Sequence, residues 1–491
     1  MVARGVRWGR VHPTWKQDEQ DAGGHKGPHR PTSAAPAPTD GEGVRRIENW
    51  RSTMMMNKCD VIVLDGRLRQ SLATVRSLGR RGLRVAALET RADAPTFSSR
   101  WCRSSFVCPA EEGSQGYFDY LMQVLDLTGA RVLISSSDGT IELLRQHRGK
   151  LEQRVKLALA GEPALDMAID KEQTLDIARQ LGLKVPRGVL VSQVHEAREV
   201  WEALGEVGLP AVVKPTRSWT SNGQQGTRLA SRLVTTHEEA FRAVEELTRS
   251  GGKTLIQQFL PGRCEAIGFF YAQGEILARF AYWAKRTDPP LGGTDVMGQS
   301  MMVPADSGGQ AERLIREIGL EGYALVEFRR DSAGQPYLME INSRLNAGIA
   351  HAVKAGVDFP YMLYSWAIGE KIEAVKSYRT GKWMRYLSGD IASTAAAVRQ
   401  RGRPGVSTPA RALRDFVTDF FVPAHYDYVD WRDLLPVWTA TSGWLRSFPQ
   451  LLRRAFSRSD PPPDAHVLPA WEQPAPNMEI QQEKGEETAH V

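Results

Sequence analysis

Two glutamates, Glu327 and Glu340, lie on either side of a short turn and could act as a pair of carboxylates. Strand-like runs flank the turn 331–334, which predicts a β-hairpin. Side chains alternate between the two faces of each strand. In the first strand one face carries Leu325, Glu327 and Arg329 and the other carries Val326 and Phe328. In the second strand one face carries Leu338, Glu340 and Asn342 and the other carries Met339 and Ile341. Glu327 and Glu340 should then be direct or diagonal neighbours across the hairpin.

Neighbouring carboxylates repel each other unless a positive charge lies between them. Mg²⁺ takes one or two carboxylates and completes its shell with water and nucleotide phosphates, so this pair could hold that ion. The alternative is a solvated hairpin face that Arg329 and Arg344 neutralise. The spacing alone leaves both interpretations open.

A lysine and a polar loop upstream could bind phosphate groups. Lys214 ends the apolar run 211–214, and the loop 221–226 contains Ser221, Asn222, Gly223 and Gly226. A strand-end lysine beside a glycine-containing loop can cradle phosphates. Taken alone this signal is weak, because strand-end lysines are usually surface residues.

A second apolar strand could hold a flat base and a sugar. The run 255–260 contains Gln257, Gln258, Phe259 and Leu260, and a Pro-Gly break separates it from the strand that begins at Glu265. Such an edge followed by one carboxylate suits a base and a ribose. The alternative for Glu265 is a surface acid at a strand start.

The elements that must position these groups follow two patterns. Short apolar strands at 61–64, 85–88 and 132–134 alternate with helices, which predicts a small, mainly parallel sheet. Asp170, with Gln173 three residues on, resembles a capping box that opens a second unit, and the chain is rich in strands from Pro210 to about Asn342. Gly66 is not followed by a full G-x-G-x-x-G, so dinucleotide binding by the first sheet is poorly supported.

The composition excludes several classes of protein. The 491 residues are 42% hydrophobic and 24% charged, as in ordinary globular proteins. The 63 basic residues are interleaved with 57 acidic ones, so we expect no nucleic-acid partner. Four cysteines form no disulfide framework, and no apolar run is long enough for a membrane span or a signal peptide, so we expect a cytoplasmic protein without a transmembrane segment.

The order of these motifs resembles the ATP-grasp superfamily, in the branch of biotin carboxylase, the carbamoyl-phosphate synthetase large subunit and D-alanine–D-alanine ligase. The resemblance covers about residues 59–370, and its most specific part is the end of the hairpin, 339–344. It implies an α/β fold: an ATP-grasp domain of two α+β lobes, preceded by a small Rossmann-like parallel-sheet domain. Beyond residue 371 the resemblance fades, and we expect a mainly helical extension there.

The resemblance also implies roles for individual residues. Lys171 and Lys214 would bind the phosphates of ATP, and the loop with Ser221, Asn222, Gly223 and Gly226 would close over them. Adenine would be held by Gln257, Gln258, Phe259 and Leu260, and the ribose by Glu265. Glu327, Glu340 and Asn342 would hold Mg²⁺ or Mn²⁺. Arg344 would be catalytic at the carboxylate or acyl phosphate. Apart from the resemblance, Arg286 belongs to a Lys-Arg pair before a Pro/Gly loop and is a second catalytic candidate, which could face the anionic substrate or phosphate; the alternative is that 285–294 is a surface connector.

The implied function is an ATP-dependent carboxylate–amine ligase, which activates a carboxylate as an acyl phosphate for attack by an amine. Its partners would be these two small-molecule substrates, and the resemblance allows a homodimer. The alternatives are a carboxylase or carbamoyl-phosphate-synthetase-like enzyme that activates bicarbonate, and a non-catalytic ATP-binding regulatory protein. The absence of a biotin-carrier Met-Lys-Met motif and of a second grasp copy disfavours the first alternative.

The predicted domains are 57–168 (Rossmann-like), 169–372 (ATP-grasp) and 373–458 (extension), between disordered segments at 1–56 and 459–491. Three methionines at 54–56 suggest that translation starts there, and the preceding segment could otherwise be a binding arm. In the extension, aromatic residues and arginines between 426 and 456 indicate packing against the body of the protein. The alternative is an amphipathic element, interrupted by Pro449, on a membrane surface or a partner.

Overall fold

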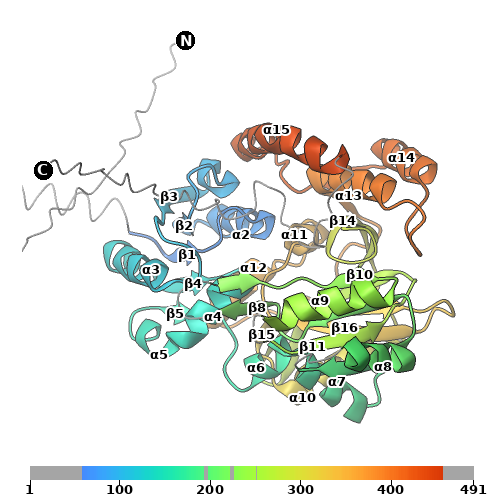
Figure 1. Cartoon of the computed structure of the whole chain (residues 1–491). Coiled ribbons are helices and arrows are strands. Elements are labelled where there is room, and N and C mark those ends of the chain that lie inside the picture. The colour runs from blue at the N-terminus through green and yellow to red at the C-terminus, as the bar shows by residue number, and fades with distance from the viewer. Residues whose placement is uncertain (1–57, 193–196, 222–225, 250–251, 457–491) are drawn as a thin grey trace, which may run out of the picture. The chain divides into compact units, whose positions relative to one another are not determined.

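The computed structural model describes residues 58–192, 197–221, 226–249 and 252–456, without the side chains of 221 and 447–456 (Figure 1). All of these residues belong to one compact unit, Thr53–Val491. The predicted disordered segments 1–56 and 459–491 lie outside the described residues. The domain boundaries at 168 and 372 stay predictions.

The first part of the described chain contains a five-stranded parallel sheet, as the sequence predicts. Its order is β3-β2-β1-β4-β5, from β1 (Val61–Val63), β2 (Val85–Glu89), β3 (Cys102–Val107), β4 (Val132–Ile134) and β5 (Lys156–Leu157). The helices are α2 (Arg69–Arg80), α3 (Gln115–Thr128), α4 (Asp138–Gln146), α5 (Arg148–Leu151) and α6 (Ala164–Ile169). The central strands are buried along their whole length, which explains their unbroken apolar runs.

An antiparallel sheet of order β10-β7-β11-β6 forms the second layer. It contains β6 (Gly188–Val191), β7 (Ala211–Pro215), β10 (Arg232–Val234) and β11 (Thr254–Gln258). The helices α8 (Ala197–Val207) and α9 (His237–Arg249) pack on it through an apolar cluster that includes Val200, Val244 and Ile256. A separate two-stranded hairpin, β8 (Trp219–Ser221) and β9 (Gly226–Arg228), follows β7.

Helix α7 (Lys171–Gln180) precedes this sheet and begins where the sequence predicts. The Oδ1 atom of Asp170 accepts hydrogen bonds from the backbone N–H groups of Glu172 (2.9 Å) and Gln173 (3.3 Å). The reciprocal half of the capping box does not form. The Asp170 N–H already donates to the Asp166 carbonyl (3.1 Å), and the Gln173 side chain donates to the Asp166 carboxylate instead.

A seven-stranded sheet of order β16-β15-β12-β13-β14-β17-β18 forms the largest layer. Its strands are β12 (Cys264–Ala272), β13 (Glu275–Asp288), β14 (Thr294–Met301), β15 (Gly322–Arg330), β16 (Pro336–Asn342), β17 (Trp383–Arg385) and β18 (Ala424–Tyr426). Helix α10 (Gly308–Ile318) lies between β14 and β15 in sequence, so the region from 210 to 342 is less purely strand-like than expected. Helices α11 (Ile349–Ala355) and α12 (Phe359–Ala367) follow the hairpin.

The predicted hairpin is β15–β16, but its faces differ from the prediction at one point. A bulge between Glu327 and Phe328 leaves Met339 without a direct partner, so that Phe328 pairs with Leu338. Leu338 therefore lies in the apolar core with Phe328 and Ile341 instead of beside Glu340. The period-two prediction for Leu338 was wrong because one extra residue in a strand shifts every later side chain to the other face.

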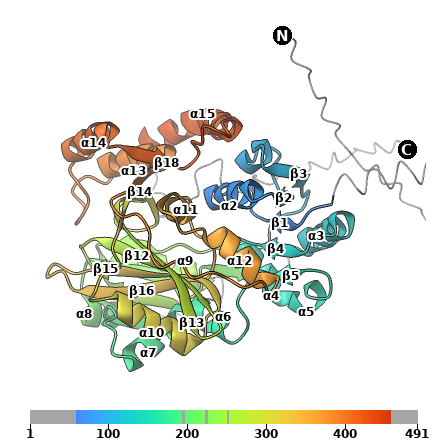
Figure 2. The same cartoon turned by 180° about the vertical axis from the view of Figure 1, so that it is seen from behind.

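The C-terminal extension is mainly helical, as expected, and it also adds β17 and β18 to the large sheet. Its helices are α13 (Leu387–Arg399), α14 (Pro409–Thr418), the 3₁₀ turn η2 (Asp419–Phe421) and α15 (Leu435–Phe456) (Figure 2). Pro449 does not interrupt α15, contrary to the prediction. Proline removes one N–H donor, and this helix continues without that hydrogen bond.

Candidate active site

The hairpin places Glu327 and Glu340 directly opposite each other. The Asn342 side-chain amide donates a hydrogen bond to Glu327 Oε1 (2.9 Å), so the three predicted metal ligands lie together. Burial, and then the charge of Glu340, raise the pKa of Glu327 to about 8. Two carboxylates and an amide oxygen suit Mg²⁺, which takes its remaining ligands from water and phosphates. No group of three or more His, Cys, Asp or Glu side chains within the described ranges forms a metal cage.

Two lysines from other elements face this carboxylate pair. Lys171, the first residue of α7, has its Nζ 3.3 Å from Glu340 Oε2 and 3.1 Å from Ser218 Oγ. Lys214 lies near the end of β7, and burial lowers its pKa to about 8. Burial would raise the pKa of Glu340, but Lys171 and Lys214 together hold it below its usual value. The site is therefore a cluster of two half-buried glutamates and two buried lysines, and it differs from the solvated hairpin face that the sequence left open.

Arg344 follows β16 and is anchored by a residue that the sequence analysis missed. Its Nη2 donates to Asp138 Oδ2 (3.0 Å), and its Nε donates to Oδ1 of the same carboxylate. Asp138 is the first residue of α4, after the strand β4. The only local signal for it is the Ser-Asp-Gly sequence after an apolar strand, which is typical of a helix start.

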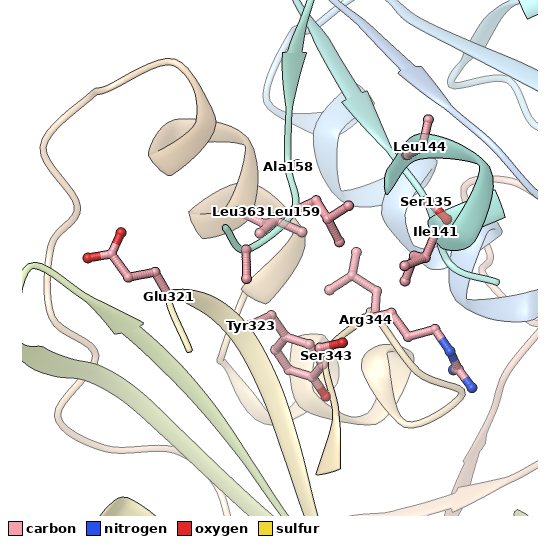
Figure 3. A pocket seen from close by; sticks show the side chains of 12 residues that line it. Ser135, Ile141, Leu144, Ala158, Leu159, Glu321, Tyr323, Ser343, Arg344 and Leu363 are labelled. Carbon is pink, nitrogen blue, oxygen red and sulfur yellow. The ribbon is translucent and has the colours of Figure 1, made fainter. Parts of the chain in front are cut away.

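Arg344 also lines a pocket between the end of the hairpin and the parallel sheet (Figure 3). Its lining residues are Ser135, Ile141, Leu144, Ala158, Leu159, Ala160, Glu321, Tyr323, Ser343, Arg344, Leu345 and Leu363. Ser135 belongs to the loop after β4, where the carboxyl ends of parallel strands commonly hold ligands. This pocket adjoins the carboxylate cluster through Arg344.

The predicted phosphate loop belongs to the hairpin β8–β9. Ser221 ends β8 and Gly226 begins β9, while Asn222 and Gly223 lie outside the described residues. The hairpin contacts the first sheet's helix α4. A Cβ at Gly139 of α4 would lie 2.7 Å from the Trp219 ring, and Arg228 lies 3.8 Å from Asp138.

The predicted adenine strand ends two residues earlier than expected, because β11 stops at Gln258. Leu260 is buried, and the guanidinium of Arg329 lies 5.7 Å from the Phe259 ring centroid. Gln257 is 1% exposed, and neither its amide nitrogen nor its oxygen has a hydrogen-bond partner among the described residues. A buried amide of this kind has hydrogen-bonding capacity for a ligand such as a purine.

The structure gives Glu265 and Arg286 partners that the sequence did not predict. The buried Glu265 carboxylate accepts two hydrogen bonds of 2.8 Å from Arg330 and one of 2.7 Å from Arg263. The Arg286 guanidinium donates to Asp390 (2.6 and 2.8 Å) and to Asp419, both from the extension. The ribose role of Glu265 and the substrate role of Arg286 stay predictions, and each would require these ion pairs to open.

Comparison with solved structures identifies the fold. The chain resembles the biotin carboxylase–ATP analogue complex of Campylobacter jejuni, with a TM-score of 0.53 and 14% identity over 66% of this chain and 74% of that one. N5-carboxyaminoimidazole synthetase of Staphylococcus aureus gives a TM-score of 0.50 and 15% identity over 66% and 80%. The chain therefore has the ATP-grasp fold.

Sequence comparison gives a more particular match. Residues 255–389 match the family described as ATP-grasp in the biosynthetic pathway with Ter operon. The D-alanine–D-alanine ligase of Coprothermobacter proteolyticus is 26% identical over 189 residues, which are 36% of this chain and 59% of that enzyme. The ligase of Ectopseudomonas mendocina is 25% identical over 194 residues, 38% of this chain and 58% of that enzyme. The chain thus spans somewhat less than two thirds of these relatives' length.

Proposed function

We propose that the protein is an ATP- and Mg²⁺-dependent carboxylate–amine ligase. The observation that carries the proposal is the Glu327–Glu340 pair, with Lys171 and Lys214 against it and Arg344 at its edge. The relatives are named D-alanine–D-alanine ligases, and joining two alanines links a carboxyl group to an amine. This supports the same kind of reaction here. A homodimer stays a prediction.

In the proposed reaction, a carboxylate oxygen of the first substrate attacks the γ-phosphorus of ATP. The bond between that phosphorus and the β–γ bridging oxygen breaks, which yields an acyl phosphate and ADP. The nitrogen of an amine then attacks the acyl carbon and displaces phosphate, and one proton leaves the nitrogen as the amide forms. A carboxylate is a poor electrophile, so the first step is needed to supply a leaving group.

The residues of the site would position the reactants and neutralise charge. Glu327, Glu340 and Asn342 would hold the metal, which when bound neutralises phosphate charge. Lys171 and Lys214 would contact the phosphates, and Arg344 would bind the substrate carboxylate, held in orientation by Asp138. The pocket beside Arg344 has room for about one water molecule, so it would have to widen to admit the organic part of a substrate.

Glu340→Gln tests this proposal. We expect ADP release in the presence of Mg²⁺, ATP and a panel of carboxylates and amines to fall at least about a hundredfold, because the variant loses a metal-binding charge beside two lysines. Glu275→Gln is the matched control, because its side chain on β13 is 75% exposed and lies outside the cluster. It should retain activity.

Three outcomes would contradict the proposal. Unchanged ATP turnover in Glu340→Gln would show that Glu327 and Glu340 do not act together as metal ligands. ADP release with bicarbonate alone would favour the carboxylase alternative. No ADP release with any pair in a broad panel would favour a non-catalytic ATP-binding protein.

A further inference from the structure

The C-terminal extension exposes many large apolar side chains. Phe421, Trp431 and Trp438 are 86%, 85% and 73% exposed, whereas large apolar side chains are normally scattered singly over a surface. Several of the residues recur at helical spacing along α14 and α15. We define the C-terminal face as the exposed residues Leu413, Val417, Phe421, Trp431, Leu435, Trp438 and Leu445.

The opposite side of the same elements is attached to the protein. Ala440 of α15 is buried, and Thr439 Oγ1 lies 2.9 Å from Ser98 Oγ in the 3₁₀ turn η1 (Pro95–Ser98). Helix α13 contacts both α14 and α15. The C-terminal face is thus the outer face of elements that already have an inner partner, and packing against the body of the protein, which the sequence favoured, accounts for only one side of α15.

Charge is segregated between these two sides. Five of the six acidic residues between 380 and 446 have side chains at most 10% exposed, and each pairs with a cation: Asp390, Asp419, Asp427, Asp430 and Asp433. Their partners on the rest of the chain include Arg69, Arg76 and Arg286. The sixth, Asp415, bonds to Arg414 on its own helix. The acids of the extension therefore contribute almost no negative charge to the C-terminal face.

Arginines occupy the exposed side instead. Arg411, Arg432 and Arg446 are exposed beside the apolar residues of the C-terminal face. The 22 residues of α15 contain no Asp or Glu. Asp415 is the one partly exposed acid in this stretch, and it pairs with Arg411 and Arg414. Exposed tryptophan, leucine and arginine with so few acidic residues are the composition of helices that lie in the interface of an anionic membrane.

We propose that the C-terminal face binds the surface of an anionic lipid bilayer, with α15 lying along the interface. No helix among the described residues is long and apolar enough to cross a membrane, so the contact is peripheral. A second copy of the chain fits less well, because a symmetric contact through this face would bring arginines against arginines. The peripheral contact would hold an ATP-grasp site next to a membrane, which is a property beyond the proposed reaction.

Vesicle co-sedimentation of the full-length protein tests the proposal. We expect binding to vesicles of equimolar phosphatidylcholine and phosphatidylglycerol, weaker binding to pure phosphatidylcholine, and loss of binding as salt rises. The double variant Trp431→Ser/Trp438→Ser and the double variant Arg432→Gln/Arg446→Gln should each weaken binding roughly tenfold or more.

Matched controls come from helix α8. Trp201 is 51% exposed there and the Arg198 side chain is 78% exposed, so Trp201→Ser and Arg198→Gln remove the same side-chain types from another surface. Both controls should bind vesicles like the unaltered protein. The four substituted residues, the two tryptophans and the two arginines, are exposed. Urea unfolding of the variants should therefore match that of the unaltered protein.

Four results would overturn the proposal. The full-length protein could fail to bind phosphatidylglycerol vesicles, or both control variants could lose binding as much as the face variants. The tryptophan variants could change the oligomeric state in sedimentation velocity while vesicle binding stays the same, which would make the face an interface between copies. Finally, vesicle binding could require removal of 459–491, which has seven acidic residues and one lysine, and that would assign the face to this segment.

Discussion

At the scale of single residues, the paired carboxylates Glu327 and Glu340 have pKa values shifted in opposite directions. Burial disfavours the charge of both Glu327 and Glu340. Glu340 has Lys171 at 3.3 Å and keeps a low pKa, whereas Glu327 is held by a neutral amide and has a raised pKa. The local partner therefore decides which carboxylate is ionised before any ligand is bound.

Lys214→Ala should weaken ATP binding by about tenfold or more, measured by calorimetry, because a buried cation beside the proposed phosphate site is removed. Lys376→Ala provides the control, since Lys376 is an exposed lysine in the loop after α12. An ATP affinity that is the same in Lys214→Ala and in the unaltered protein would show that Lys214 does not contact the phosphates.

Asp65, after β1, gives a pH prediction at a second buried carboxylate. It accepts hydrogen bonds from Ser136 N (2.7 Å) and Thr140 Oγ1 (3.0 Å), and burial followed by the charge of Glu112 raises its pKa to about 8. The folded protein thus binds a proton that the unfolded chain releases near pH 4. The stability that this proton contributes is present below that pH and is lost as the pH rises to about 8.

Asp65→Asn should remove this pH dependence. The free energy of unfolding of the unaltered protein should fall, relative to the variant, by at most about 1.4 kcal/mol per pH unit between pH 4 and 8. Asparagine also tolerates the positive φ of 60° at this position. Urea unfolding at several pH values measures the difference, and parallel curves for the two proteins would contradict the raised pKa.

At the scale of elements, the β8–β9 hairpin depends on a close approach to α4. Gly139 lies where a side chain would meet the Trp219 ring, and Asp138 beside it pairs with Arg344. One turn of α4 therefore positions both the β8–β9 hairpin, which carries the predicted phosphate loop, and Arg344 at the pocket. Neither contact is visible in the sequence of either element.

Gly139→Ala should displace the hairpin, although alanine favours a helix more than glycine does. The new methyl group would meet Glu112 Oε1 and would lie 2.7 Å from the Trp219 ring, and we expect a loss of about 1–3 kcal/mol of stability and weaker ATP binding. Gly205→Ala in α8 is the control, because its Cβ would meet no atom within 4 Å, and it should be neutral or stabilising. Equal effects of both substitutions in urea unfolding would show that the close approach has no energetic consequence.

At the scale of the whole molecule, the extension is attached by buried ion pairs far apart in sequence. Asp390 is fully buried and pairs with Arg385 and Arg286, and Asp433 pairs with Arg76 of α2. Strands β17 and β18 extend the large sheet beside β14. The extension is thus part of the structure that carries the candidate site.

Asp390→Ala should cost about 3–5 kcal/mol of stability, because it leaves the buried Arg385 guanidinium without its carboxylate and removes one of the two carboxylates that pair with Arg286. Glu202→Ala, which removes the exposed Arg198–Glu202 pair on α8, should cost about 0.5 kcal/mol or less. Urea unfolding of both variants measures the contrast. A small loss for Asp390→Ala would mean that solvent replaces the buried pair without penalty.

Local patterns in the sequence were sufficient for much of the fold and part of the site. The apolar runs of β1, β2 and β4, the helix start at Asp170 and the hairpin of Glu327 and Glu340 were all predicted, because each depends on neighbours a few residues away. The prediction for Leu338 failed at the same hairpin, since a bulge changes the backbone without changing the alternation of residue types.

Tertiary structure alone decided which charges meet. Asp138 and Arg344 are 206 residues apart in the sequence, and Arg286 and Asp390 are 104 residues apart. No spacing rule connects the members of either pair. A charged side chain shows its type in the sequence, whereas its partner depends on which distant segments fold beside it. The sequence by itself determined the elements and the residue types of the carboxylate and lysine cluster. The fold determined that Arg344 belongs to that cluster through Asp138, and that the acids of the extension turn inward and leave an apolar, arginine-bearing face outside.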